Sequence, residues 1–392
     1  MQSPPIFKPR TPLEYAPSWV DDRFLTGQSD AEWHRKNTPN LSLTNYARGK
    51  RRELAKTITS KTRIYLDQQY WIHCRNAAAG LVQGVHFEIW KTLLSLVQGG
   101  RAACPISSIS LTETFKQADL NTRRQTAEVM DELSAGIALR SSAGRRAAEF
   151  ELLWRRLAGE VVNDGHRAEQ AFTWLFEVFG ALTVAKDRGP STDWEAIGKA
   201  MFDTLGRLRF PDLLLAMPEL SNEILFARDH ASRVLHDQIS AQNSQKSCTF
   251  EKRLHQEIEG VFKWLRKELM PVCVMWSNGS EDLAKLACES LVSLVSGMHA
   301  NGEFKRILPT FYLRAVIYAA IDHKHRHFDD GDMFDHDHAI AALPYCQVFL
   351  TEKKLGTLLT EKPAQLDKEY GCRVLWNADE VLAELITLTR AG

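Results

Sequence analysis

Acidic and histidine side chains crowd one late stretch of the chain, from Ile321 to His338. Carboxylates and imidazoles at this density are potential metal ligands. Other acids follow short apolar runs: Asp67 ends Arg63-Ile-Tyr-Leu-Asp67, and Glu352 comes directly after Gln347-Val-Phe-Leu-Thr351. Carboxylates that lie close together need a cation between them, so these acids predict a metal site if the fold unites them.

The elements that would position these acids alternate between strand-like and helical patterns. Arg63 to Asp67 has the apolar residues of a short buried strand, and Arg101 to Ile106 predicts a second one. Val348 to Leu350 and Cys372 to Trp376 predict two late strands with helical segments between them. This β-α-β order favours a parallel sheet, which binds ligands at the carboxyl ends of its strands.

Each acid also has a purely structural interpretation. Asp67 is equally suited by position to cap the helix predicted after its strand. Glu113 lies on a helix that begins near Ser107, and its spacing alone favours a solvated surface acid. Asp332 and Asp335 lie one turn apart at the start of a late helix.

The middle of the chain has an almost entirely helical pattern. Apolar residues recur there at intervals of three and four, and no comparably clear strand pattern interrupts them. Residues 1–47, in contrast, show no sustained period, and the basic segment from Arg48 to Lys56 favours the start of a solvated helix over contact with phosphates. We therefore expect an irregular N-terminal arm over residues 1–60, an α/β domain formed by 61–117 and 305–392, and an all-helical insertion over 118–304.

Composition limits the classes of function. The 49 Lys and Arg residues balance 49 Asp and Glu residues, so any binding to nucleic acid or membrane must depend on local charge. The seven cysteines are scattered and form no C-x-x-C pair, which predicts reduced thiols in a cytoplasmic protein. We expect no secretion signal, because prolines stand in the first ten residues where a signal peptide has its apolar segment. We also expect no membrane span, because the most apolar stretch, Ile307 to Ile321, is short and interrupted.

Three segments together resemble the PIN-like nucleases, whose metal site is formed by acids distributed in this order. The resemblance rests on Ile64-Tyr-Leu-Asp67, on Pro105 to Glu113, and on the long segment from Asp332 to Lys353. It implies a three-layer α/β fold with a central parallel sheet. The helical insertion and the N-terminal arm lie outside it.

The resemblance also implies roles for individual acids. Asp67 would be the first metal acid and Glu113 the second. Asp335 would be the third, because its interval to Thr351 is similar to that between the family's third acid and the threonine that closes the next strand. These three residues are the expected catalytic acids.

Two further acids would complete the metal site. Asp332 would assist or replace Asp335, and Glu352 stands where the family more often has Asp. Oxygen ligands of this kind favour Mg²⁺ or Mn²⁺ over Zn²⁺. Substrate contacts are expected from His338, Lys353 and Arg326.

The resemblance implies an endonuclease that hydrolyses phosphodiester bonds, with RNA favoured as the substrate. The helical insertion would then select the substrate, or bind a regulatory protein or a second copy of the chain. Three alternatives remain open. They are a DNA-cleaving relative, a non-catalytic PIN-like scaffold that binds nucleic acid or protein, and a helical interaction protein with zinc at His336 and His338.

Overall fold

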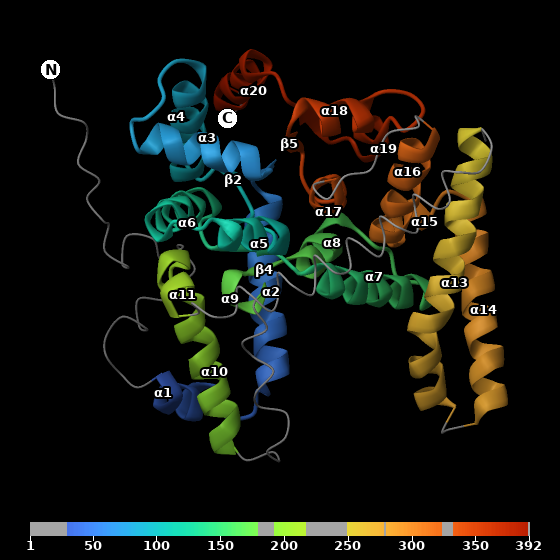
Figure 1. Ribbon diagram of the computed structural model, residues 1–392. Helices are drawn as coiled ribbons and strands as arrows, with labels where there is room; N and C mark the ends of the chain where they lie inside the picture. The colour runs from blue at the N-terminus through green and yellow to red at the C-terminus, as the bar shows by residue number, and fades with distance from the viewer. Residues whose placement is uncertain (1–29, 179–191, 217–248, 278–279, 324–331, 391–392) are drawn as a thin grey trace, which may run out of the picture.

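The computed structural model describes residues 30–178, 192–216, 249–277, 280–323 and 332–390 (Figure 1). The strands are β1 Thr62–Leu66, β2 Ala102–Ala103, β3 Ile137–Leu139, β4 Phe172–Trp174, β5 Val348–Leu350 and β6 Arg373–Leu375. The helices of the first half are α1 Asp30–Asn37, α2 Leu43–Thr59, α3 Gln68–Ala78, α4 Val85–Gln98, α5 Ser108–Lys116, α6 Leu120–Ser134, α7 Ser142–Leu157, α8 Asp164–Ala171 and α9 Leu175–Val178. Those of the second half are α10 Thr192–Gly206, α11 Phe210–Ala216, α13 Phe250–Trp276, α14 Glu281–Ala300, α15 Phe304–Ile307, α16 Pro309–His323, α17 Asp332–Ala342, α18 Lys353–Thr360, α19 Leu366–Tyr370 and α20 Ala378–Arg390.

A four-stranded parallel sheet lies at the centre of the α/β part, with the strand order β2-β1-β5-β6. The parallel sheet and the positions of β1, β5 and β6 confirm the sequence prediction. The two central strands are short and buried, and Ile64, Tyr65 and Leu66 of β1 pair with the equally apolar Val348–Leu350 of β5. A fully buried strand of this kind needs no polar alternation.

Helices cover both faces of this sheet. The connection from β1 to β2 contains α3 and α4, and the connection from β5 to β6 contains α18 and α19. The two connections step outward in opposite directions, so right-handed crossovers place their helices on opposite faces. Helix α20 packs against α4 (Figure 1).

The second strand is shorter than Arg101 to Ile106. Only Ala102 and Ala103 pair with β1. Pro105 has no N–H to donate, and the neighbouring amides turn away from the sheet. Cys104 N donates to Leu133 O at 3.0 Å, and Ile106 N donates to Ile137 O at 3.1 Å. The chain therefore leaves the sheet after Ala103.

The prediction of an all-helical insertion was wrong. Strands β3 and β4 lie within this segment and form an antiparallel pair, with Ile137 opposite Trp174. Ile106 forms an isolated bridge to Ala138 of β3. Three-residue strands carry too little pattern to be recognised, and Phe172 also fits a helical interval with Leu175. The main apolar core runs without a break from the central sheet into β3, β4 and α6.

The expectation of an irregular arm was also wrong for residues 30–59, whereas the helix favoured for the basic segment Arg48 to Lys56 is confirmed. This part forms α1 and α2, and residues 1–29 lie outside the described part of the chain. Helix α2 contains the basic segment, whose Arg51 and Arg52 pair with Glu177 and Glu169. The full extent of α2 was missed because much of its stabilisation comes from tertiary contacts with α8, α10 and β4.

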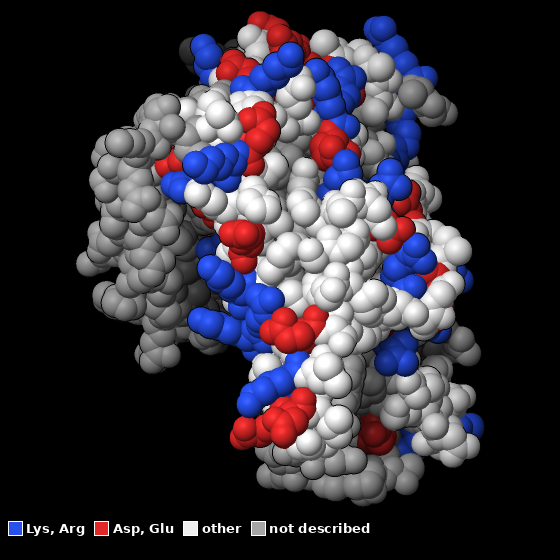
Figure 2. Space-filling view, turned by 90° about the vertical axis from the view of Figure 1, so that its right-hand side faces the viewer, with Lys and Arg blue, Asp and Glu red and all other residues white. Residues whose placement is uncertain are grey.

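Helices α13 and α14 form a long pair at one side of the molecule (Figure 1). They have a separate apolar core of their own, which includes Leu269, Cys273 and Cys288. Figure 2 shows this side, and acidic and basic side chains are interspersed across it. This face therefore has no broad region of a single charge, in keeping with the balanced composition.

Candidate metal centre at the carboxyl edge of the sheet

Two polar residues follow the paired central strands. Leu66 of β1 is in register with Leu350 of β5, so Asp67 and Thr351 come next at the same edge of the sheet. Asp67 N donates to Leu350 O at 3.1 Å, and Thr351 N donates to Leu375 O at 2.9 Å. The parallel register thus unites the ends of the two segments that carry the first and last expected acids.

Asp67 caps the helix that follows it. Its Oδ1 accepts a hydrogen bond from Tyr70 N at 3.1 Å, so the capping interpretation is confirmed. The side chain is buried, and burial raises the pKa of this carboxyl to about 6. The charge of His338, the Tyr70 N–H and the Thr351 hydroxyl lower this pKa, while Glu113 raises it. Asp67 is therefore a buried acid that interacts electrostatically with both Glu113 and His338.

Glu113 lies on α5, which begins at the end of the second strand segment. Ser107 caps this helix, because its Oγ accepts a hydrogen bond from Ser110 N at 3.1 Å. Glu113 Oε2 lies 2.7 Å from His338 Nε2, and the Glu113 side chain is 19% exposed. The interpretation of Glu113 as a solvated surface acid is therefore wrong, since it forms an ion pair with a buried histidine.

A chain of hydrogen bonds holds His338 in place. Tyr65 Oη donates to Ser107 Oγ at 2.7 Å and lies 2.7 Å from His338 Nδ1. Burial lowers the pKa of His338, but Tyr65, Glu113 and Asp67 together hold it well above the ordinary value for histidine. A charged imidazole donates from both nitrogens, which matches an acceptor at Tyr65 and a carboxylate at Glu113.

Helix α17 carries the third expected acid. Asp335 precedes His338 by three residues and so lies on the same face of the helix, where its side chain is half-buried. The helix packs against α5, which carries Glu113. Asp332 begins α17, but its side chain lies outside the described part of the structure. Helical spacing therefore puts Asp335 on the face of α17 that carries His338.

The remaining expected site residues differ in what the structure shows. Glu352 follows Thr351 directly and stands at the start of α18, where its half-buried side chain makes no capping hydrogen bond. Lys353 is exposed beside it. Arg326 lies outside the described residues.

The donor chemistry of this edge suits a hard cation, because its acids offer carboxylate oxygens. Asp67 has a buried carboxyl whose ionised form is disfavoured by burial, and a bound cation would relieve that cost. Within the described residues, however, no three His, Cys, Asp or Glu side chains lie close enough together to hold an ion. In this arrangement the Glu113 carboxylate is paired with His338, so it would have to turn toward a metal.

Among the residues described, His336 and His338 do not face a common point where they could bind one zinc ion together. His338 contacts Tyr65 and Glu113, while His336 is buried with its ring against Tyr318 at 5.8 Å between centroids.

The described cysteines are free thiols and buried, as expected from their spacing. No helix within the described ranges has both the length and the apolar character needed to cross a membrane.

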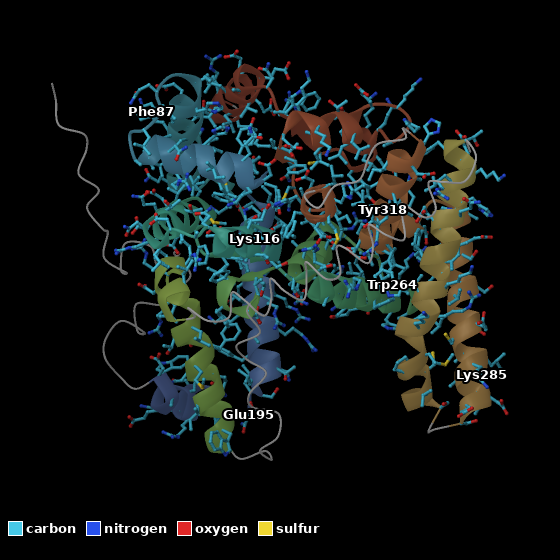
Figure 3. All side chains as sticks on the ribbon, in the orientation of Figure 1. Phe87, Lys116, Glu195, Trp264, Lys285 and Tyr318 are labelled. Atoms are coloured by element: carbon cyan, nitrogen blue, oxygen red, sulfur yellow. The ribbon has the colours of Figure 1, made fainter. Side chains whose placement is uncertain are left out.

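The sequence interpretation missed three residues of this site. Tyr65 and Ser107 form the hydrogen-bond chain to His338. Lys116 lies on α5, one turn beyond Glu113, and its Nζ lies 4.0 Å from the centroid of the Phe334 ring (Figure 3). Helical spacing from Glu113 could have indicated Lys116, whereas no local signal marked Tyr65.

The fold and site define a mostly helical α/β protein with a small four-stranded parallel sheet and an acidic cluster, formed by Asp67 and Glu113, at its carboxyl edge. Comparison with known proteins found no matching family, no matching curated protein and no matching solved structure.

Proposed function

We propose that this chain is a metal-dependent endonuclease with a PIN-like fold, and that RNA is its favoured substrate. The observation that supports this most is the meeting of Asp67, Glu113 and His338, which come from three distant segments. They meet at the carboxyl edge of a parallel sheet, where open α/β folds bind their ligands. Asp335 lies on the same face of α17 as His338, which adds the third acid.

Asp67, Glu113 and Asp335 would hold Mg²⁺ or Mn²⁺, with Asp332 and Glu352 as further oxygen ligands. When bound, such an ion supplies a water of lowered pKa and positive charge for the leaving oxygen. The protein fixes the first of these acids through its backbone, because Tyr70 N holds the Asp67 carboxylate at the start of α3. The reaction would release a 5′-phosphate and a 3′-hydroxyl.

We assign His338 a positioning role in place of the substrate contact that the resemblance implies. Its side chain is only 1% exposed, and both ring nitrogens already face partners, Tyr65 and Glu113. A histidine buried in this way orients the Glu113 carboxylate and keeps a positive charge next to it. Residues that hydrogen-bond to a metal ligand in this way fix the orientation of that ligand.

Exposed cations near the acids are better suited to contact a substrate phosphate. Lys116 lies against Phe334, the neighbour of Asp335, and Lys353 follows Glu352. Both ammonium groups belong to exposed residues, and such groups bind phosphodiester oxygens as point charges. We propose them as substrate contacts together with Arg326.

The test is cleavage of labelled RNA and DNA of matched sequence, in Mn²⁺ or Mg²⁺ and in EDTA. The proposal expects metal-dependent cleavage with RNA cut faster, and loss of cleavage in Asp67→Asn and Asp335→Asn. Faster cleavage of DNA would favour the DNA-cleaving alternative. Cleavage that persists in both variants would contradict the assignment of the metal acids.

One observation favours a second candidate, a PIN-like scaffold that binds nucleic acid without cutting it. Glu113 is paired with the His338 cation, which gives the acidic cluster a protein-based counter-charge in place of a metal. Metal binding distinguishes the two candidates. A scaffold would bind RNA equally well in EDTA and would show no Mn²⁺ binding that depends on Asp67.

A further inference from the structure

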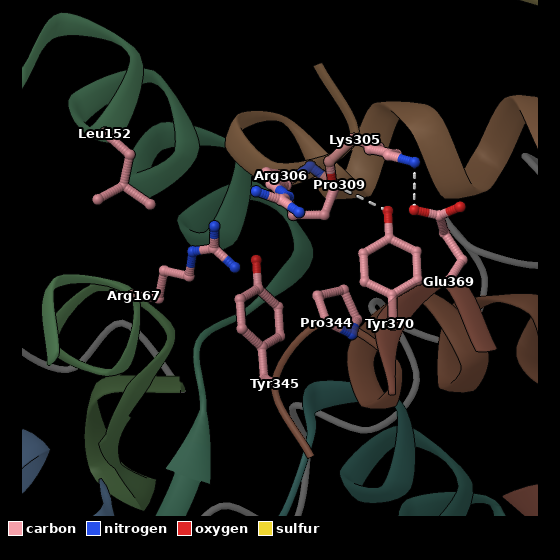
Figure 4. A pocket seen from close by; sticks show the side chains of 9 residues that line it. All are labelled: Leu152, Arg167, Lys305, Arg306, Pro309, Pro344, Tyr345, Glu369 and Tyr370. Carbon is pink, nitrogen blue, oxygen red and sulfur yellow. Dashed lines mark hydrogen bonds and ion pairs between the residues drawn. The ribbon is translucent and has the colours of Figure 1, made fainter. Parts of the chain in front are cut away.

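A small cavity lies on the opposite side of the α/β part from the acidic cluster. It has a volume of about 110 Å³, and Pro344 and Tyr345 line it at the amino end of β5 (Figure 4). The cluster of Asp67 and Glu113 lies at the carboxyl end of the same sheet. Since a water occupies about 30 Å³ of liquid, the cavity has room for a group the size of a few waters.

Positive charge dominates the lining of this cavity. Arg167 of α8, with Lys305 and Arg306 of α15, provides three cations, and Glu369 is the lining carboxylate. Glu369 is already paired with Lys305, so it does not neutralise the two arginines. The cavity therefore carries two guanidinium groups without an acidic partner in its lining.

The two arginines converge on one point. In Figure 4 the guanidinium groups of Arg167 and Arg306 and the hydroxyl of Tyr345 point toward one another. Among the described residues, neither guanidinium forms an ion pair or a hydrogen bond, and Arg167 Nε is buried without a partner. Two like charges held together in this way repel unless an anion lies between them.

A third arginine, Arg145, adds positive charge near Tyr345, although it does not line the cavity. Arg145 is 1% exposed and acts electrostatically on Tyr345, as Arg167 also does. Its Nη1 donates to Arg140 O at 2.8 Å, while its Nε and Nη2 have no partner in the described structure. The buried acid one turn further along α7, Glu149, interacts electrostatically with Arg145 and accepts hydrogen bonds from Thr310 and from the Tyr345 hydroxyl, the latter at 3.0 Å.

We propose that this cavity, which we call the arginine pocket, binds the phosphate group of a small phosphorylated ligand between Arg167 and Arg306. Guanidinium groups match phosphate oxygens with paired hydrogen bonds, and the Tyr345 hydroxyl lies at the point where the two meet. The small volume favours a single phosphate over a nucleic-acid backbone, which needs an open groove. Tyr370 and Tyr345 provide aromatic surface for whatever the phosphate is attached to.

This site does not depend on the proposed nuclease activity, and its test can be separated from it. Binding of inorganic phosphate, AMP and adenosine to the full chain is measured by isothermal titration calorimetry in EDTA. We expect phosphate and AMP to bind and adenosine alone not to bind. AMP that binds more tightly than inorganic phosphate would show that the pocket also holds the attached group, whereas equal affinities would identify the free anion as the ligand.

Substitutions locate the site. Arg306→Gln and Arg167→Gln should each weaken phosphate binding by about 10- to 100-fold, since each removes a charge-assisted hydrogen bond to the phosphate. Arg390→Gln, an exposed arginine at the end of α20, is the matched control and should bind as the unmodified chain does. Arg306 is exposed, so its replacement should leave folding intact, which circular dichroism checks.

Three results would overturn the proposal. The first is an absence of phosphate binding to the unmodified chain. The second is unchanged binding in both pocket variants. The third is an equal loss in Arg390→Gln, because that would show a general attraction of anions to surface charge.

Discussion

The Nε2 atom of His338 lies 2.7 Å from Oε2 of Glu113, although 225 positions separate the two residues in the chain. The contact joins α17 to α5 and places a buried positive charge among carboxyl groups. Because its charge faces both Asp67 and Glu113, His338 offsets the repulsion between these two carboxyl groups.

Asp67→Asn should abolish metal-dependent cleavage while the fold is retained. Asparagine caps a helix as well as aspartate does, so the hydrogen bond from Tyr70 N can persist. The loss of a charged ligand should lower the cleavage rate by about 100-fold or more. Single-turnover cleavage of labelled RNA measures this, and Asp379→Asn on α20 is the matched control at an exposed position. Equal rates for the two variants would refute a role of Asp67 in metal binding.

Tyr65→Phe should weaken metal binding more than it weakens the fold. The substitution removes the hydroxyl that contacts both Ser107 and His338, so His338 loses part of its orientation. Loss of a group that orients a metal ligand typically lowers metal affinity by about 10- to 100-fold. Titration of Mn²⁺ in the cleavage assay measures this change.

The control for this substitution is Tyr370→Phe, which removes the hydroxyl of a half-buried tyrosine, bonded to Lys305 O at 3.0 Å. Both variants should lose about 1–3 kcal/mol of stability, because each leaves a polar group without its hydrogen-bond partner. Only Tyr65→Phe should change the Mn²⁺ dependence. If both variants changed it equally, the effect would be one of stability and not of positioning.

Glu149 should make the free energy of unfolding decrease as pH rises from about 4.5 to about 7. Burial raises the pKa of its carboxyl to about 7, while hydrogen bonds from Thr310 and Tyr345 and the charge of Arg145 lower it. The folded state therefore keeps this proton over a range in which the unfolded chain releases it. The stability that results is complete below the unfolded pKa and is lost as pH approaches the folded value, by about 3 kcal/mol at most.

Chemical denaturation between pH 4 and pH 8 measures this dependence. Glu149→Gln keeps an acceptor for Thr310 N and should flatten the slope between about pH 4.5 and 7. Glu151→Gln, an exposed acid on the same helix, should retain the slope of the unmodified chain. A slope that is the same in all three proteins would show that Glu149 is not the group responsible.

Gly356 should tolerate no side chain. It lies on α18 against Trp376, and a Cβ at this position would overlap the indole ring. Gly356→Ala should therefore lower the free energy of unfolding by about 1–3 kcal/mol, as expected for overpacking. Gly297→Ala in α14 meets open space and should instead raise it by about 0.5–1 kcal/mol, because alanine favours a helix. Thermal unfolding of both variants tests the pair, and destabilisation of equal size would contradict this interpretation.

Local patterns in the sequence were enough to find the central sheet. The apolar runs that end at Leu66 and Leu350 predicted β1 and β5, and a run near Val374 predicted β6. Parallel pairing then implied that Asp67 and Thr351 share an edge, which the register confirms. The cap formed by Asp67 could also be predicted, since it involves only residues within one turn.

Short strands within the helical middle escaped prediction. Ile137–Leu139 and Phe172–Trp174 each contain three residues, and their pairing with one another is set by packing against the main core. The same limit applies to the start of α2, the part before its basic segment, in a helix that packs against α8 and α10. The periodic signal in such segments is weaker than the tertiary contacts that decide their conformation.

The sequence by itself determined which acids the chain offers and at which strand ends Asp67 and Glu352 lie. Only the tertiary structure decided that Glu113 faces His338, that Tyr65 holds the imidazole, and that two arginines converge in a cavity at the other end of the sheet. The reason is physical. Strand ends and helix caps depend on neighbours in the chain, whereas a contact across 225 positions depends on how helices pack and on the direction in which each side chain leaves its helix.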